Sequence, residues 1–136
     1  MRVGFELLIK RRPLSVQAEK GRKQAWIEDV RRLAKKEWNR AAPLDDEAFA
    51  ATLVFLYDSD PIDVDNIIKP ILDALNGVVY PDDVLITDVA AHRRQFADEF
   101  DFTRLPKGLI TAIRNEKECV YVRILAGANP VQLAVF

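Results

Sequence analysis

The sequence predicts a small α+β domain in which two to three helices pack on a mixed sheet of about four strands. The chain has 136 residues, which suits one domain over residues 1–136 and leaves little room for a second. Four stretches have the apolar patterns of strands, and two or three stretches between them have helical spacing. The order strand, helix, strand, helix, strand, short helix, strand gives helices packed on one sheet.

The first half of the chain contains two predicted strands and one predicted helix. Residues 3–9 place apolar side chains at alternate positions, as in a strand with one buried face. Apolar residues recur at helical spacing from about residue 22 to 38, where Trp26 and Trp38 are interpreted as core or interface anchors. Residues 52–57 are rich in β-branched and aromatic residues, which predicts a buried strand.

A second helix is predicted over residues 66–76, followed by Gly77 as the residue after its C-cap. Pro70 lies inside this stretch, although a proline removes one main-chain hydrogen bond and clashes with the carbonyl one turn earlier. We therefore expect residues 63–66 to form a non-helical turn and the regular helix to begin late.

Three more elements are expected after this helix. Residues 84–93 and 119–125 alternate as strands do, and residues 106–115 form a short helix between them. Residues 94–104 are predicted to be a loop. The apolar tail at residues 131–136 can dock on the domain or on a second subunit.

Composition excludes several classes of protein. Hydrophobic residues make up 49% and charged residues 30% of the chain, which is typical of a globular protein rather than a disordered one. No apolar run approaches 18 residues, and Glu6 and Lys10 interrupt the segment that a signal peptide would need. The single cysteine, Cys119, cannot form an internal disulfide. We therefore expect a cytoplasmic protein with no membrane partner and no structural zinc site.

Charge is distributed unevenly along the chain. Residues 1–40 carry 12 Lys and Arg against 5 Asp and Glu, a net +7, whereas residues 41–101 carry 3 against 14, a net −11. A nuclease can use one basic surface for the phosphate backbone and one acidic site for metal. The alternative, which charge alone favours, is that the basic residues form the solvated face of an amphipathic helix.

One short stretch concentrates the residues that metal-dependent phosphoryl chemistry requires. Asp63 and Asp65 lie two residues apart, and Asp83 follows at the start of the next element. Carboxylates brought together repel, so we expect a divalent cation such as Mg²⁺ among these three. Asn66 can hold a ligand by hydrogen bonding, and Lys69 can meet the phosphate or the leaving oxygen as a fixed cation.

Each of these residues also has a purely structural interpretation. Asp63 or Asp65 can cap the helix, Lys69 can pair with the acid four residues later, and Asp82 together with Asp83 can form a turn. Asp82 and Asp88 are expected to support the metal ligands or to face solvent. The predicted strand also carries His92, which we expect to be partly exposed, with contact to DNA or metal as the alternative.

The whole pattern resembles the signature of the RusA-type Holliday junction resolvases. The resemblance covers residues 63–88 and is carried by Asp63-x-Asp65-Asn66-x-x-Lys69-x-x-x-Asp73-Ala74-Leu75, then Gly77 and Asp82-Asp83. It implies that Asp63, Asp65 and Asp83 are the acidic catalytic residues and that Lys69 is required for activity. It further implies a homodimer that places two active sites on a four-way DNA junction, with magnesium or manganese as cofactor.

The hypothesis from sequence is therefore a magnesium-dependent endodeoxyribonuclease that resolves Holliday junctions or related branched DNA in recombination and repair. Family members are often encoded by phages and prophages. One alternative is a non-catalytic protein that binds branched DNA or regulates its processing while keeping the same fold. A second alternative is a structural interaction protein that uses Trp38 and the apolar tail.

Overall fold

Four strands form one mixed sheet in the computed structural model, which describes residues 1–128. The strands are β1 (Arg2–Ile9), β2 (Ala48–Tyr57), β3 (Ile86–Gln95) and β4 (Cys119–Gly127), in the spatial order β1-β4-β2-β3. Both neighbours of β4 run antiparallel to it, and β2 and β3 run parallel to each other. The tail at residues 131–136 lies outside the described residues, so its predicted docking is untested.

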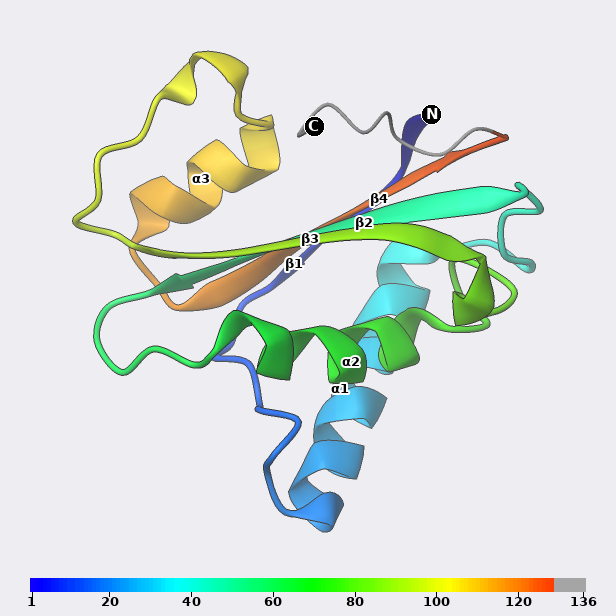
Figure 1. Ribbon diagram of the computed structural model, residues 1–136, viewed down its shortest axis with the longest axis horizontal. Coiled ribbons are helices and arrows are strands. Elements are labelled where there is room, and N and C mark those ends of the chain that lie inside the picture. The colour runs from blue at the N-terminus through cyan, green and yellow to red at the C-terminus, as the bar shows by residue number, and fades with distance from the viewer. Residues whose placement is uncertain (129–136) are drawn as a thin grey trace.

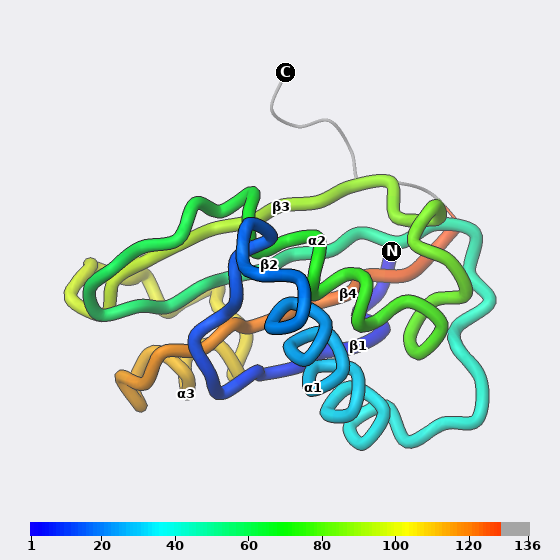
Figure 2. Tube along the Cα trace, turned by 90° about the horizontal axis from the view of Figure 1, so that it is seen from below, coloured from blue at the N-terminus to red at the C-terminus, as the bar shows by residue number. Residues whose placement is uncertain are grey.

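Helices cover both faces of this sheet. The helices α1 (Lys20–Trp38) and α2 (Val64–Leu75) lie on one face, and α3 (Lys107–Asn115) lies on the other (Figure 1). Figure 2 looks from the side of α1 and α2, with the sheet behind them. The three helices and the four-stranded mixed sheet confirm the predicted α+β class.

The larger of the two apolar clusters lies between the sheet and the α1/α2 layer. Trp38 packs edge-on against Phe5 of β1 with ring centroids 5.6 Å apart, and Trp26 is 2% exposed. Both tryptophans are therefore core residues, as interpreted from the sequence, and neither is available for base stacking. None of the helices within residues 1–128 has both the length and the apolar character needed to cross a membrane.

The start of α2 differs from the prediction. Regular helix begins at Val64, so the expected non-helical turn over residues 63–66 is wrong. The reason is that the Asn66 carbonyl, which Pro70 cannot satisfy, accepts a hydrogen bond of 2.7 Å from the Val16 amide. The loop before α1 thus provides the hydrogen bond that the proline removes, and helical geometry continues through Pro70.

Tertiary contacts also satisfy all four terminal carbonyls of α2. The Tyr80 hydroxyl donates to the Leu72 carbonyl at 2.6 Å, and the Arg31 guanidinium donates to the Asp73 and Ala74 carbonyls at 2.7 and 3.2 Å. The Leu75 carbonyl accepts from the amides of the turn that follows. Gly77 has a φ of +81°, the left-handed conformation expected after a helix C-cap. This end of α2 is therefore held rigidly against α1 and the turn.

We expect Tyr80→Phe to lower the free energy of unfolding by about 1–2 kcal/mol, because it leaves the buried Leu72 carbonyl without its donor. The ring itself is fully buried and would keep its apolar contacts. Urea denaturation followed by circular dichroism measures the change. The half-buried Tyr57 has no hydrogen bond through its hydroxyl among the described residues, so Tyr57→Phe is the control and should change stability by much less.

Two strand boundaries differ from those predicted. The strand β2 begins at Ala48 rather than at residue 52, because its small residues pair with β4 on one side and β3 on the other. A single turn of 3-10 helix (Asp83–Leu85) precedes β3, which begins at Ile86 instead of residue 84 and continues to Gln95. The predicted loop at residues 94–104 contains a second such turn, Phe102–Arg104.

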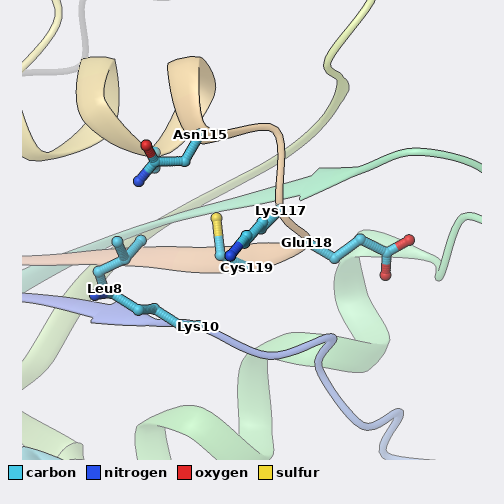
Figure 3. A pocket seen from close by; sticks show the side chains of 7 residues that line it. Leu8, Lys10, Asn115, Lys117, Glu118 and Cys119 are labelled. Atoms are coloured by element: carbon cyan, nitrogen blue, oxygen red, sulfur yellow. The ribbon is translucent and has the colours of Figure 1, made fainter.

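A hollow of about 240 Å³ lies between the end of α3 and the adjoining ends of β1 and β4. Figure 3 shows the Cys119 sulfur pointing toward the end of α3 that carries Asn115, with Lys10 and Lys117 nearby. Burial raises the pKa of the Cys119 thiol to about 11. The thiol is therefore protonated at neutral pH and is a packing residue rather than a nucleophile.

We expect Cys119 of the folded protein to react with a thiol-specific reagent at pH 8 about 200-fold more slowly than in the unfolded chain. A pKa near 11 leaves roughly one thiol in a thousand ionised at that pH, against about one in four for an ordinary cysteine. The rate should rise about tenfold for each pH unit until the pKa is reached. Equal rates with and without urea would contradict the burial of this thiol.

Candidate active site

A cavity between α2 and the start of β3 brings together three of the four residues predicted to be catalytic. Asp65, Lys69 and Asp83 line this cavity, whose volume is about 310 Å³. The rest of the lining is apolar and consists of Ile68, Leu72, Ile86 and Val89. Two acids and one amine therefore share a hollow with a largely apolar wall.

The local structure explains how these side chains meet. Asp65 lies in the first turn of α2, and Lys69 follows one turn later on the same helix face. Asp83 begins the 3-10 turn that leads into β3. The helix α2 is the crossover between the parallel neighbouring strands β2 and β3, and the chain that leaves α2 returns to the sheet through the turn that carries Asp83.

Lys69 joins the two elements through ion pairs. Its ammonium lies 2.7 Å from an Asp73 carboxylate oxygen and 3.3 Å from an Asp83 carboxylate oxygen. The hydrogen bond to Asp73, with a smaller contribution from Asp83, raises the pKa of Lys69 above its ordinary value. Lys69 therefore carries a positive charge throughout the neutral pH range. The pair with Asp73 suggested by the sequence exists, and Asp83 is a second partner for the same ammonium.

Asp63 is placed differently from the other candidate acids. It occupies the N-cap position of α2, but its side chain makes no capping hydrogen bond. Its carboxylate lies 3.6 Å from the Arg93 guanidinium of β3 and is 77% exposed. Asp63 does not line the cavity that Asp65 and Asp83 share. The structure thus brings two of the three predicted metal ligands together and pairs the third with an arginine.

The supporting residues predicted from sequence have different positions. Asp82 accepts a hydrogen bond of 3.1 Å from the Val84 amide, so it caps the 3-10 turn that presents Asp83. Asn66 contributes its carbonyl to the Val16 amide, which anchors the first turn of α2. Asp88 accepts from the neighbouring Thr87 hydroxyl at 2.6 Å and does not line the cavity.

The donor set of the cavity is compatible with a magnesium ion. Within residues 1–128, no three His, Cys, Asp or Glu side chains converge into a ready-made metal cage. Magnesium is usually held by only one or two carboxylates, with waters and substrate phosphates as its other ligands. Asp65 and Asp83 provide two such carboxylates in the lining of a single cavity. These two residues are therefore the ones that fit as ligands.

Three features of the site were missed from the sequence. Arg93 pairs with Asp63, Tyr80 holds the end of α2 beneath the cavity, and Val89 contributes an apolar wall although it is 47% exposed. Arg93 and Val89 belong to an alternating strand, and nothing in that alternation distinguishes the face beside α2 from the opposite one. Tyr80 follows a glycine turn, and only the path of the chain shows that its hydroxyl returns to the helix.

Two arginines of α1 make contacts within the chain, and Arg31 is half-buried rather than on the solvated face of the helix. Arg31 is bound to the carbonyls at the end of α2, and Arg32 pairs with Asp29 at 3.0 Å. Hydrogen bonds from Arg11 and Arg32 hold the pKa of the Asp29 carboxyl below its ordinary value. These arginines are therefore engaged in contacts within the chain.

The sequence of the chain matches a known protein family. The family model described as Endodeoxyribonuclease RusA matches residues 14–102, well over half of the chain. The matched part includes α1, β2, α2 and β3 and every residue that lines the cavity. A search among curated proteins gives no match.

Proposed function

The chain belongs to the RusA endodeoxyribonuclease family, and from this membership we propose that it is a magnesium-dependent endonuclease that cuts Holliday junctions or related branched DNA. The observation that carries the proposal is the cavity where Asp65, Lys69 and Asp83 meet. Its acids suit a hard divalent cation, and its amine suits a phosphate oxygen. Processing of branched DNA would place the protein in recombination and repair, in the cytoplasm.

In this proposal Asp65 and Asp83 hold Mg²⁺, and Mn²⁺ can replace it. When bound, the ion supplies a nucleophilic hydroxide and neutralises charge on the reacting phosphate. Asp63 is the third metal ligand in this proposal. Its side chain is 77% exposed and, among residues 1–128, is held by the pair with Arg93 alone, so a rotation about its side-chain bonds can bring it toward the substrate.

Lys69 contributes a fixed positive charge. Its ammonium is held by Asp73 at 2.7 Å, which orients it toward Asp83 and the cavity. A cation fixed before the reaction stabilises the charge that develops on the phosphate without having to reorganise. Asp82 keeps Asp83 in position because it caps the turn that Asp83 begins.

A homodimer is part of the proposal. A four-way junction contains pairs of equivalent strands, whereas one chain has one cavity of this composition among its described residues. Two symmetric copies would place one site on each strand of a pair. Sedimentation of the purified chain with and without a synthetic junction measures the stoichiometry, and a complex with one chain per junction would contradict the dimer.

The activity is tested by comparing cleavage of three DNA substrates in the presence and in the absence of metal. Purified protein is incubated with a synthetic four-way junction, a flap and a linear duplex of the same sequence, with Mg²⁺ or with EDTA. We expect cleavage of the branched substrates with Mg²⁺, restoration by Mn²⁺, and none with EDTA. Equal cutting of all three substrates, or absence of cutting, would contradict the proposal.

One observation favours the non-catalytic alternative, namely that Asp63 pairs with Arg93 outside the cavity. A protein that only binds branched DNA would bind the four-way junction equally well in Mg²⁺ and in EDTA. It would also show no measurable Mg²⁺ binding in calorimetry. Mg²⁺ binding that is lost in Asp83→Ala would instead favour the enzyme.

A further inference from the structure

A second cavity lies on the opposite face of the sheet, between α3 and the strands β2, β3 and β4. Its volume is about 310 Å³. Roughly half of the residues that line it, including Leu105, Leu109 and Arg123, lie outside the stretch that the family model matches. This cavity is therefore separate from the candidate active site, and the residues that the family model matches form only part of its lining.

Positive charge is concentrated in this cavity. Arg94 and Arg123 line it together with His92, and no carboxylate is among its lining residues. Strand register explains the arrangement, because His92 and Arg94 pair with Val54 and Leu56 of β2, while Arg123 pairs with Thr52 from the other side. The side chains of His92, Arg94 and Arg123 share one face of the sheet, where β3 and β4 lie on either side of β2.

Arg123 is half-buried, and one nitrogen of its guanidinium group lacks a hydrogen-bond partner among residues 1–128. That nitrogen, Nε, is itself buried. The nearest acid along the sheet is Glu6, which pairs with Arg123 in the β1–β4 register. Glu6 accepts a hydrogen bond from the Tyr121 hydroxyl and forms no ion pair with Arg123 among the described contacts. A buried donor without a partner is costly, and an anionic ligand would satisfy it.

The other walls of the cavity are apolar. Phe100, Leu105 and Leu109 contribute to them, and the ring of Phe100 packs against Phe102 with centroids 6.1 Å apart. A ligand that fits both parts of the cavity has an anionic end and a flat or apolar body. The volume is near the lower limit of about 300 Å³ for small-molecule cavities, so one small organic group fits and a DNA duplex does not.

We propose that this cavity binds one unpaired nucleotide, with its phosphate at Arg94 and Arg123 and its base against Phe100 and Leu105. The inference rests on the proposed function in one respect, namely that branched DNA supplies such nucleotides where its strands separate. Arginine suits phosphate because its planar fork donates two hydrogen bonds, and an aromatic wall suits any base.

The position of the cavity connects it to the candidate active site. The strand β3 is an edge of the sheet, and it borders the candidate active site through Val89 and the second cavity through His92 and Arg94. Residues 89 and 94 are five positions apart, about 17 Å along a strand. A single strand of DNA that crosses the exposed edge of β3 can therefore reach both cavities within a few nucleotides.

His92 is the only histidine of the chain, so its imidazole gives a unique proton NMR signal inside this cavity. The protein is titrated in EDTA, where no cleavage occurs, with thymidine 5′-monophosphate, inorganic phosphate, a short oligothymidylate and a blunt duplex. We expect saturable shifts of the His92 signal with the mononucleotide and with the oligonucleotide. Equal shifts with inorganic phosphate alone would overturn the assignment of the base to the apolar wall.

Arg123→Met tests the phosphate contact. By fluorescence anisotropy in EDTA, we expect it to weaken binding of the oligonucleotide about tenfold and to lower the slope of log affinity against log salt by about 0.7. The control is Arg22→Met, because Arg22 is exposed on α1 and lines neither cavity. Circular dichroism checks the fold of both variants. Equal loss in both variants, or none in Arg123→Met, would overturn the inference.

The same titration distinguishes the two sources of the nucleotide, namely a DNA strand and a free nucleotide. Tighter binding of the oligonucleotide than of the mononucleotide supports a DNA strand, and the reverse order would overturn the DNA assignment in favour of a free nucleotide. A His92 shift that follows protein concentration rather than nucleotide would show a second copy of the chain in this cavity and overturn the inference.

The failure of this inference is distinguishable from failure of the proposed function. Asp83→Asn leaves the second cavity intact, so its His92 shift should equal that of the unmodified protein even if cleavage is lost. Absence of cleavage in the unmodified protein with a normal His92 shift would contradict the proposed function alone. Normal cleavage with a His92 signal that no nucleotide moves would contradict this inference alone.

Discussion

Asp83→Asn is expected to lower the rate of junction cleavage by about 100- to 1000-fold. The substitution keeps the size and shape of the side chain but removes the negative charge that, with Asp65, is proposed to hold the metal. Stabilisation of charge by a bound ion is worth several kcal/mol, and each 1.4 kcal/mol changes the rate tenfold. The measurement is single-turnover cleavage of a synthetic four-way junction in Mg²⁺, with Mg²⁺ affinity determined by calorimetry.

The neighbouring acid provides a matched control. Asp82→Asn makes the same chemical change one residue away, at a side chain that does not line the cavity. The asparagine oxygen can still accept from the Val84 amide, so the turn that presents Asp83 should persist. We expect cleavage by Asp82→Asn within a few-fold of that of the unmodified protein. Equal losses in the two variants would mean that Asp83 acts through the turn rather than through metal.

Lys69→Met is expected to lower the cleavage rate by about 100-fold without weakening the binding of Mg²⁺. Methionine retains most of the length and the apolar stem of lysine, but the fixed positive charge beside the phosphate is lost. The same change removes a cation that competes for Asp83, since the two groups lie 3.3 Å apart. Metal affinity should therefore stay constant or rise while the rate falls. Calorimetry and single-turnover cleavage measure the two quantities separately.

The alternative role of Lys69 is a surface ion pair with Asp73, four residues later on α2. Such a pair contributes a few tenths of a kcal/mol to stability and nothing to catalysis. Asp73→Asn is the control, because it breaks this pair and leaves the ammonium beside Asp83. We expect Asp73→Asn to lower cleavage less than Lys69→Met, because the ammonium charge stays beside Asp83 and only its contact with Asp73 is weakened. If Lys69→Met and Asp73→Asn had the same small effect on stability and none on cleavage, Lys69 would be structural.

The fold class and the order of elements could be predicted from the sequence. Alternation and helical spacing of apolar residues depend only on neighbouring positions, and they located all four strands and three helices. The placement of β4 between β1 and β2 could not be predicted. The alternation of apolar residues shows which face of β4 is buried, but it does not show which strands lie beside β4.

The boundaries of α2 show where local rules were insufficient. Pro70 favoured a late start of the helix, because rules based on neighbouring residues do not include a hydrogen-bond donor as distant as residue 16. The Val16 amide supplies that donor, so the helix begins at Val64 and Asp65 lies in its first turn. This affects the candidate site directly, because Asp65 and Lys69 share one face only if the helix already includes both.

By itself, the sequence determined which groups are available for chemistry: closely spaced acids, one lysine near them, a single cysteine and a single histidine. Only the tertiary structure decided which of them meet. Asp65, Lys69 and Asp83 line one cavity because α2 connects two parallel strands and returns the chain beside itself. Asp63 lies beside Arg93 because the opposite charge comes from a strand thirty residues later, a partnership that depends on folding rather than on spacing.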